Sequence, residues 1–144
     1  MDLRVPLSIV AALSVAPLPP GDASAVFGRW HISSDSCPNV CAMSRAESQA
    51  WHGRKASYDS TIARFGQDSC LHPLYLARVR TEADFLDNDR ISMRQLGITT
   101  STVTVVDIRC PGDWDSPGAS LIVKDKDHII AMSDGVYFEL KRDQ

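Results

Sequence analysis

The sequence predicts a mainly β protein, a small antiparallel β-barrel of about seven or eight strands with one or two short helices. Apolar and polar residues alternate with a period of two over much of residues 26–144, which is typical of half-buried strands. Turn-forming residues separate the alternating segments, and helical patterns are confined to two short stretches. Short strands joined by turns indicate an antiparallel sandwich or barrel.

Strands are predicted wherever apolar residues recur at every second position, at residues 29–33, 55–63, 75–80, 102–110, 121–124, 128–132 and 136–141. The last segment alternates most regularly, with Phe138 and Leu140 on one face and Glu139 on the other. Hairpin turns are expected at residues 125–127 and 133–135, because Asp, Ser and Gly favour turn conformations. The bulkiest residues expected to point inward are Trp30, Tyr58, Ile62, Val106, Ile108 and Phe138.

Two short helical segments interrupt this pattern. Ser44 and Glu47 have the spacing of a capping box, and Gly53 is expected to end the helix that they begin. Residues 91–96 could form one or two further turns, ended by Gly97. Neither segment is long enough to be an independent scaffold.

The first 25 residues have the features of an export signal. Arg4 gives a short basic start, residues 5–18 are largely apolar, and Ala23-Ser24-Ala25 fits the cleavage pattern. We therefore expect a signal peptide at residues 1–25, one domain at residues 26–144, and a periplasmic or secreted protein. The apolar stretch is too short and too rich in proline for a membrane span, and we expect none after it.

The charge of the chain argues against two classes of partner. The formal net charge is −3, and no run of Lys or Arg makes a local exception. We therefore expect neither nucleic acid nor an anionic membrane as partner. No motif indicates a cofactor.

Four cysteines in an exported chain indicate two disulfides. Three pairings are possible. We expect Cys70 to pair with Cys110, which would join two strands or a loop to a strand, and Cys37 to pair with Cys41 within a tight loop. From loop entropy the first bridge should contribute about 4 kcal/mol and the second about 2 kcal/mol.

Copper binding is an alternative for the second pair. Cys37-Pro38-Asn39-Val40-Cys41 resembles the strand–loop–helix motif of the copper chaperones that serve cytochrome oxidase assembly. Two thiolates at this spacing can hold Cu(I), with His128 or Met43 as the third ligand. However, Ala42 stands where those proteins have a second proline, and the βαβ pattern is missing. An oxidising compartment favours the disulfide.

Motifs spread over nearly all of residues 26–144 resemble an uncharacterised family of small exported proteobacterial proteins with a lipocalin-like β-barrel. They are Gly28–Ile32, Trp51–Ala56, Cys70-x-x-Pro73-x-Tyr75, Leu96-Gly97, Cys110 and Val136–Arg142. The resemblance implies that Trp30 closes one barrel end beneath Lys141 or Arg142 in a cation–π contact. The Cys37–Cys41 pair departs from the family, and the resemblance implies no established activity.

No catalytic motif surrounds any of the four histidines, so we expect a protein without enzymatic activity. Trp114, between Asp113 and Asp115, could anchor an interface, or it could cap the barrel end. The leading hypothesis is an exported binding protein, an inhibitor or immunity-type protein acting on a periplasmic hydrolase. The alternatives are a carrier of a small hydrophobic ligand inside the barrel, although bulky inward residues favour a filled core, and a copper-binding protein.

Overall fold

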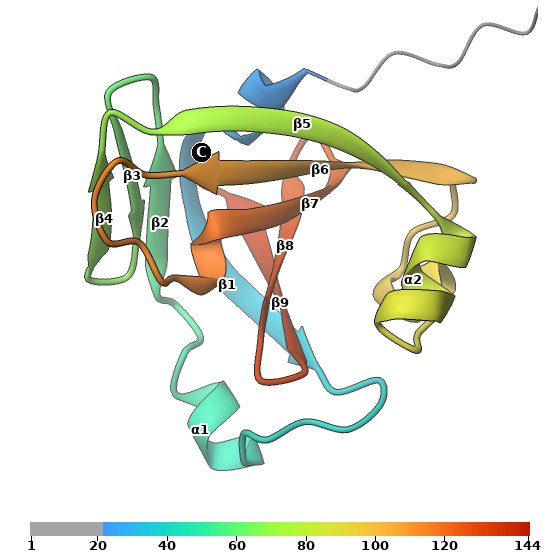
Figure 1. Ribbon diagram of the computed structural model, residues 1–144. Coiled ribbons are helices and arrows are strands. Elements are labelled where there is room, and N and C mark those ends of the chain that lie inside the picture. Colours follow the sequence, from blue (N-terminus) through green and yellow to red (C-terminus); the bar gives the residue numbers. More distant parts are fainter. Residues whose placement is uncertain (1–21) are drawn as a thin grey trace, which may run out of the picture.

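The computed structural model describes residues 22–144, and within this range nine antiparallel strands form one curled sheet (Figure 1). This confirms the mainly β class, with more strands than the seven or eight expected. The strands are β1 (Gly28–Ser36), β2 (Lys55–Tyr58), β3 (Ile62–Phe65), β4 (Asp68–Leu71), β5 (Leu74–Thr81), β6 (Thr102–Arg109), β7 (Ser120–Asp125), β8 (His128–Ser133) and β9 (Val136–Arg142).

Two α-helices and three 3₁₀ turns accompany the strands of the described range. They are η1 (Ala23–Val26), α1 (Arg45–Gln49), α2 (Glu82–Asn88), η2 (Met93–Leu96) and η3 (Pro117–Ala119). The first, η1, precedes β1, and the others lie between strands. None of the helices in residues 22–144 is long and apolar enough to cross a membrane. Most of the expected signal peptide, residues 1–21, lies outside the described residues.

The sheet is a half-barrel rather than the closed barrel expected. Consecutive strands pair with one another, and β1 pairs with β9. Within residues 22–144 the exception is β4 and β5, which form the two edges of the sheet. The disulfide between Cys70 and Cys110 joins β4 to the end of β6 at this opening, with 5.7 Å between the Cα atoms. Tyr75 of β5 also donates a hydrogen bond to the Asp59 carbonyl at 2.7 Å. A covalent bond and side chains thus tie the edges together.

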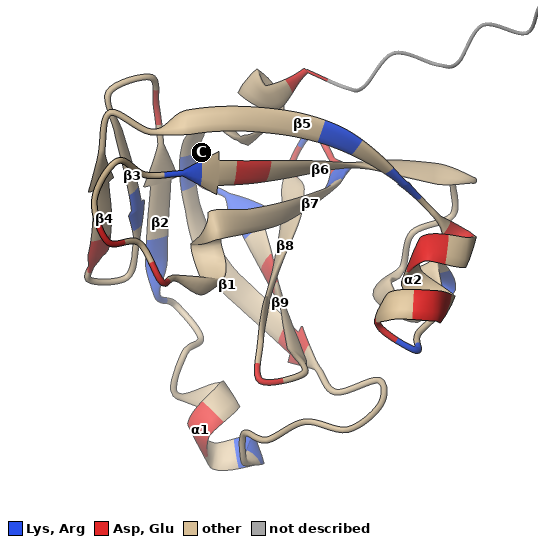
Figure 2. Ribbon diagram, viewed as in Figure 1, with Lys and Arg blue, Asp and Glu red and all other residues tan. Residues whose placement is uncertain are grey.

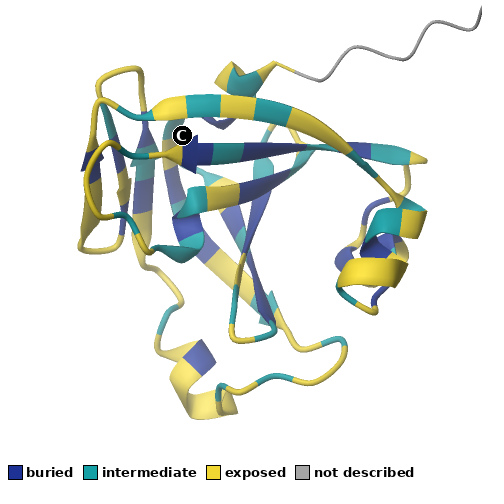
Figure 3. Ribbon diagram, in the orientation of Figure 1, coloured by how far each residue is buried: buried dark blue, intermediate teal, exposed yellow. Residues whose placement is uncertain are grey.

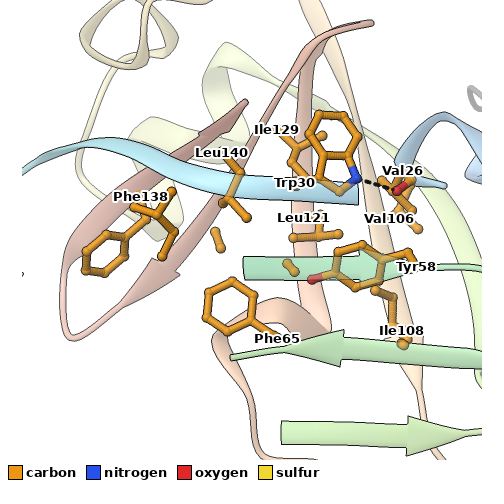
Figure 4. Packing of buried hydrophobic residues seen from close by; sticks show 14 of the residues in the cluster. Val26, Trp30, Tyr58, Phe65, Val106, Ile108, Leu121, Ile129, Phe138 and Leu140 are labelled. Carbon is orange, nitrogen blue, oxygen red and sulfur yellow. Dashed lines mark hydrogen bonds between the residues drawn. The ribbon is translucent and has the colours of Figure 1, made fainter. Parts of the chain in front are cut away.

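The concave face of the sheet surrounds the main core (Figure 4). Its largest members come from seven of the strands and are listed here: Trp30, Tyr58, Phe65, Val106, Ile108, Leu121, Ile129, Phe138 and Leu140. The Trp30 indole N–H donates to the Val26 carbonyl at 2.9 Å. Five of the six bulky residues expected to point inward lie in this core, and Ile62 does not.

Ile62 differs because residues 55–63 are not one strand. β2 ends at Tyr58, and the chain reverses around Asp59 before β3 begins. The Asp59 carboxylate accepts hydrogen bonds from the backbone N–H groups of Thr61 and Ile62, each at 2.8 Å. An aspartate that binds the backbone two residues ahead favours a turn. The reversal breaks the parity that Ile62 shares with Tyr58, and leaves Ile62 partly exposed.

A second apolar cluster covers the convex face of β6 to β9. It includes Val105, Ile122, Ile130 and Tyr137 on the strands, and Phe85 from α2 beneath them. Tyr137 is therefore buried although its neighbours Val136 and Phe138 point to the other face. In Figure 3 the buried residues are concentrated on the central strands of the sheet, whereas β5 at its edge is intermediate or exposed.

Helix α2 was not among the segments expected from the sequence. It begins with a capping box, in which the Thr81 hydroxyl accepts from the Asp84 N–H and the Asp84 carboxylate accepts from the Thr81 N–H. The other capping box is confirmed: Ser44 caps the start of α1, although α1 ends at Gln49, before the expected Gly53. The segment expected at residues 91–96 contains η2, and Gly97 ends it in the left-handed conformation.

Candidate recognition loop

The loop between β1 and α1 is closed by the disulfide between Cys37 and Cys41, as the sequence indicated. Their Cα atoms lie 5.9 Å apart. We name residues 37–41 the stapled loop. A five-residue ring closed by a covalent bond has few conformations, so the disulfide restricts the shape of the loop.

The back of the stapled loop is fixed to the sheet. The Ala42 N–H donates to the Asp134 carbonyl in the β8–β9 turn at 2.7 Å. Next to it, Gly135 packs so closely against the Val40 carbonyl that a side chain there would clash. From the other side, the Gln95 amide of η2 donates to the Pro38 carbonyl at 3.4 Å. The β8–β9 turn and η2, two parts of the chain far from it in sequence, thus hold this short loop.

The side chain of Val40 points away from these contacts and is 85% exposed, the most exposed of the large apolar residues in residues 22–144. Single exposed aliphatic residues are common on protein surfaces. Val40 differs from most because the backbone that carries it is fixed on both sides. The loop therefore presents an aliphatic side chain to solvent in a preformed geometry.

A polar groove of about 220 Å³ begins beside the stapled loop. Ser36 and Gln95 line its near end, and Lys124 and Glu139 form an ion pair of 3.1 Å within it. Asp35 also lines the groove, and its carboxylate is hydrogen-bonded to the His52 ring. A partner that covered Val40 could also form hydrogen bonds with this groove.

Trp114 lies in the loop after β6, as expected, but it is only partly exposed and packs against the main core. Its indole N–H is buried and has no hydrogen-bond partner among the described residues. Asp113 and Asp115 are exposed on either side. The contacts of Trp114 match the alternative interpretation, a residue that covers the end of the core.

The same loop is held at both ends. Cys110 is bonded to Cys70 where the loop begins. Where it ends, Gly118 packs against Tyr58 and Phe65, and the Tyr58 hydroxyl donates to the Gly118 carbonyl at 3.2 Å. Burial raises the pKa of Tyr58 strongly, so this hydroxyl stays protonated.

The basic residue that stacks on Trp30 is Arg142, with its guanidinium 4.1 Å from the ring centre. Lys141 points outward and is exposed. Arg142 also donates to the carbonyls of Phe27 at 2.6 Å and Ala25 at 3.1 Å. Cleavage after Ala25 would remove the second of these acceptors and leave the first.

The residues considered for copper are not brought together. Cys37 and Cys41 are bonded to each other, so neither is a thiolate. The stapled loop contacts the β8–β9 turn, whereas His128 lies at the opposite end of β8, about 17 Å away for a strand of this length. Met43 packs against the main core. In residues 22–144 no three His, Cys, Asp or Glu side chains are arranged to hold a metal ion.

Three of the four histidines pair with an aspartate: His31 with Asp143, His52 with Asp35 and His128 with Asp125. Hydrolases that use such a pair place a serine or cysteine against the histidine. Among the described residues no serine, threonine or cysteine side chain is hydrogen-bonded to any of them.

Sequence reasoning considered Val40 only as part of a copper motif. The sequence signal that could have identified Val40 was an aliphatic residue inside a Cys-x-x-x-Cys ring in an oxidising compartment.

Comparison with known proteins finds no matching family model, no matching curated protein and no matching solved structure.

Proposed function

We propose that this protein is an exported, non-enzymatic binding protein that inhibits another protein, most concretely a hydrolase, through the stapled loop. One observation carries the proposal: Val40 is 85% exposed on a loop that a disulfide closes and whose back is fixed to the sheet. A preformed loop loses little conformational entropy on binding, which is the property that an inhibitory loop needs.

The chemistry of the loop indicates the kind of pocket that it would enter. Val40 is aliphatic and branched at Cβ, so a small apolar pocket would accommodate it. Full burial of such a side chain contributes about 1.5–3 kcal/mol. Hydrogen bonds to the adjacent polar groove would add specificity, because Ser36 and Gln95 lie next to the loop.

The compartment and the fold family are part of the same proposal. The two disulfides in residues 22–144 indicate a non-reducing environment, which supports a periplasmic or secreted protein. A lipocalin-like origin is supported by the curled antiparallel sheet and by the stacking of Arg142 on Trp30. The opening between β4 and β5 is a departure from a closed barrel.

The packing of the interior favours a surface site over a ligand inside the sheet. Trp30 and Phe138 are fully buried, and Tyr58 and Ile108 are nearly so, in contact with other core residues. These side chains occupy the space that a hydrophobic ligand would need. The disulfide likewise occupies the two sulfur atoms that copper would need.

The test is inhibition of a panel of purified lysozymes and serine proteases by the oxidised protein. For an enzyme that is inhibited, Val40→Asp should weaken inhibition at least about tenfold, because a carboxylate would be placed in an apolar pocket. Leu86→Asp is the matched control, since Leu86 is an exposed apolar residue on α2, far along the chain from the loop. The control should inhibit as the unchanged protein does.

Removal of the Cys37–Cys41 disulfide gives a second variant. Cys37→Ser combined with Cys41→Ser keeps Val40 but frees the loop, and inhibition should weaken while the fold persists. Equal inhibition by the Val40→Asp and Leu86→Asp variants would place the contact elsewhere. Failure to inhibit any enzyme of the panel would count against the proposed function itself.

A further inference from the structure

The outer face of β9, β1, β2 and β3 carries a concentration of basic residues that the proposed function does not use. Two adjoining grooves of about 560 and 420 Å³ lie on this face. Arg29, Lys55 and Asp143 line both grooves. The acidic residues gather elsewhere, notably on α2 (Figure 2). A chain with a net charge of −3 therefore has a basic face.

The register of the strands sets the groove residues in two rows. Lys141, His31 and Lys55 lie opposite one another on neighbouring strands, as do Arg29, Ser57 and Arg64. Neighbouring strands are about 4.8 Å apart, so the two cations at the ends of each row are about 10 Å apart at the backbone. The second row is displaced from the first by one strand, so the four cations mark the corners of a parallelogram.

Three of these cations have no competing partner. In residues 22–144 the side chains of Arg29, Arg64 and Lys141 form no hydrogen bond or ion pair. Lys55 lies 3.3 Å from the Asp143 carboxylate, and His31 lies 2.6 Å from it. The hydrogen bond from His31 lowers the pKa of Asp143, so this carboxylate stays ionised.

Asp143 determines how an anion can bind. Among the described residues that line the grooves, Asp143 alone has a carboxylate side chain. Asp143 lines both grooves and so lies where they adjoin. An anionic group directly over Asp143 would be repelled, whereas groups on either side would meet unpaired cations. The lining residues of both grooves include no Phe, Tyr or Trp side chain on which a nucleic-acid base could stack.

We propose that the two grooves form a binding site for a ligand with at least two phosphate groups, one in each groove. Arg29 and Arg64 bind one group, and Lys141 with Lys55 binds the other. The stapled loop follows the far end of β1, about 23 Å along the strand from Arg29. The phosphate site is therefore separate from the proposed inhibitory contact, and an experiment can contradict either proposal without affecting the other.

Titration calorimetry tests the site with a linear hexaphosphate and with inorganic phosphate. The hexaphosphate should bind at least about tenfold more tightly, because it can reach both grooves at once. Arg29→Ala with Arg64→Ala should weaken hexaphosphate binding at least about tenfold. Arg45→Ala with Arg94→Ala, which removes two exposed cations outside the grooves, should leave it unchanged. Asp143→Asn should strengthen it, because the central negative charge is removed.

A parallel measurement distinguishes a lipid headgroup from a soluble phosphate. Vesicles of phosphatidylcholine, with or without phosphatidylglycerol, are sedimented with the protein. Recruitment that requires phosphatidylglycerol, Arg29 and Arg64 supports the site with a membrane source. Hexaphosphate binding without recruitment supports it with a soluble source. Equal affinity for hexaphosphate and inorganic phosphate, or full binding by the Arg29→Ala, Arg64→Ala variant, overturns the proposal.

Discussion

At the residue scale, Arg142 connects the last strand to the start of the chain. Its guanidinium lies 4.1 Å from the Trp30 ring centre and donates to the carbonyls of Phe27 and Ala25. It also donates to the Lys126 carbonyl at 2.9 Å. These three carbonyls belong to the entry into β1 and to the β7–β8 turn. One side chain therefore holds two segments of backbone that the strand pairing does not join.

Replacement of Arg142 should be costly for this reason. Arg142→Ala removes a cation–π contact and charged hydrogen bonds, and we expect the free energy of unfolding to fall by about 2–4 kcal/mol. Lys141→Ala is the control, because the neighbouring Lys141 side chain is exposed and should change the stability by no more than about 0.5 kcal/mol. Urea denaturation of both variants measures the difference. Similar losses of unfolding free energy in the two variants would show that the contacts of Arg142 add little to stability.

At the element scale, the two disulfides stabilise different parts of the fold. The Cys70–Cys110 bond spans 40 positions and holds the β4 edge beside the end of β6. The Cys37–Cys41 bond spans four positions and holds a loop that the β8–β9 turn and η2 already contact. The first therefore limits the unfolded chain far more than the second.

Removing each pair of cysteines should separate these roles. Cys70→Ala with Cys110→Ala should lower the free energy of unfolding by about 4 kcal/mol, and Cys37→Ala with Cys41→Ala by about 2 kcal/mol. Urea denaturation of the oxidised variants gives both values. A larger loss of stability without the Cys37–Cys41 bond than without the Cys70–Cys110 bond would contradict the expectation from loop length.

At the scale of the whole molecule, stability should depend on pH at the alkaline end. Burial and the nearby Asp89 raise the pKa of Tyr137 from 10.0 to about 12. Burial and the nearby Asp59 raise the pKa of Tyr75 from 10.0 to about 12. Below pH 10.0 these tyrosines are protonated in both the folded and the unfolded chain. Between these two values the unfolded chain loses protons that the folded chain keeps, so stability falls as the pH rises.

The melting temperature should therefore decrease between pH 10.0 and about pH 12, and Tyr137→Phe should reduce the decrease. The variant has no hydroxyl to ionise, and Tyr137 donates no hydrogen bond that would be lost among the described residues. Calorimetry across this range measures the effect, with Tyr137 ionisation followed by absorbance. A variant that loses stability as steeply as the unchanged protein would contradict the assignment.

The sequence by itself determined the β class, most of the strands, the Ser44 capping box and much of the main core. These depend on short-range spacing: Phe138 and Leu140 share a face because side chains alternate along a strand. The same parity, continued one step, places Arg142 on that face beside Trp30. Compartment chemistry indicated that the cysteines form disulfides, and their positions beside strands and within a tight loop indicated which of them pair.

Only the tertiary structure decided which outward residues are covered and which meet one another. Tyr137 is buried because α2 and η2 fold over the convex face, and Val40 is exposed because its carbonyl side faces the β8–β9 turn. The phosphate site requires the register of four strands that come from both ends of the chain. Such contacts depend on how distant segments align, and the alternation within a strand carries no information about that alignment.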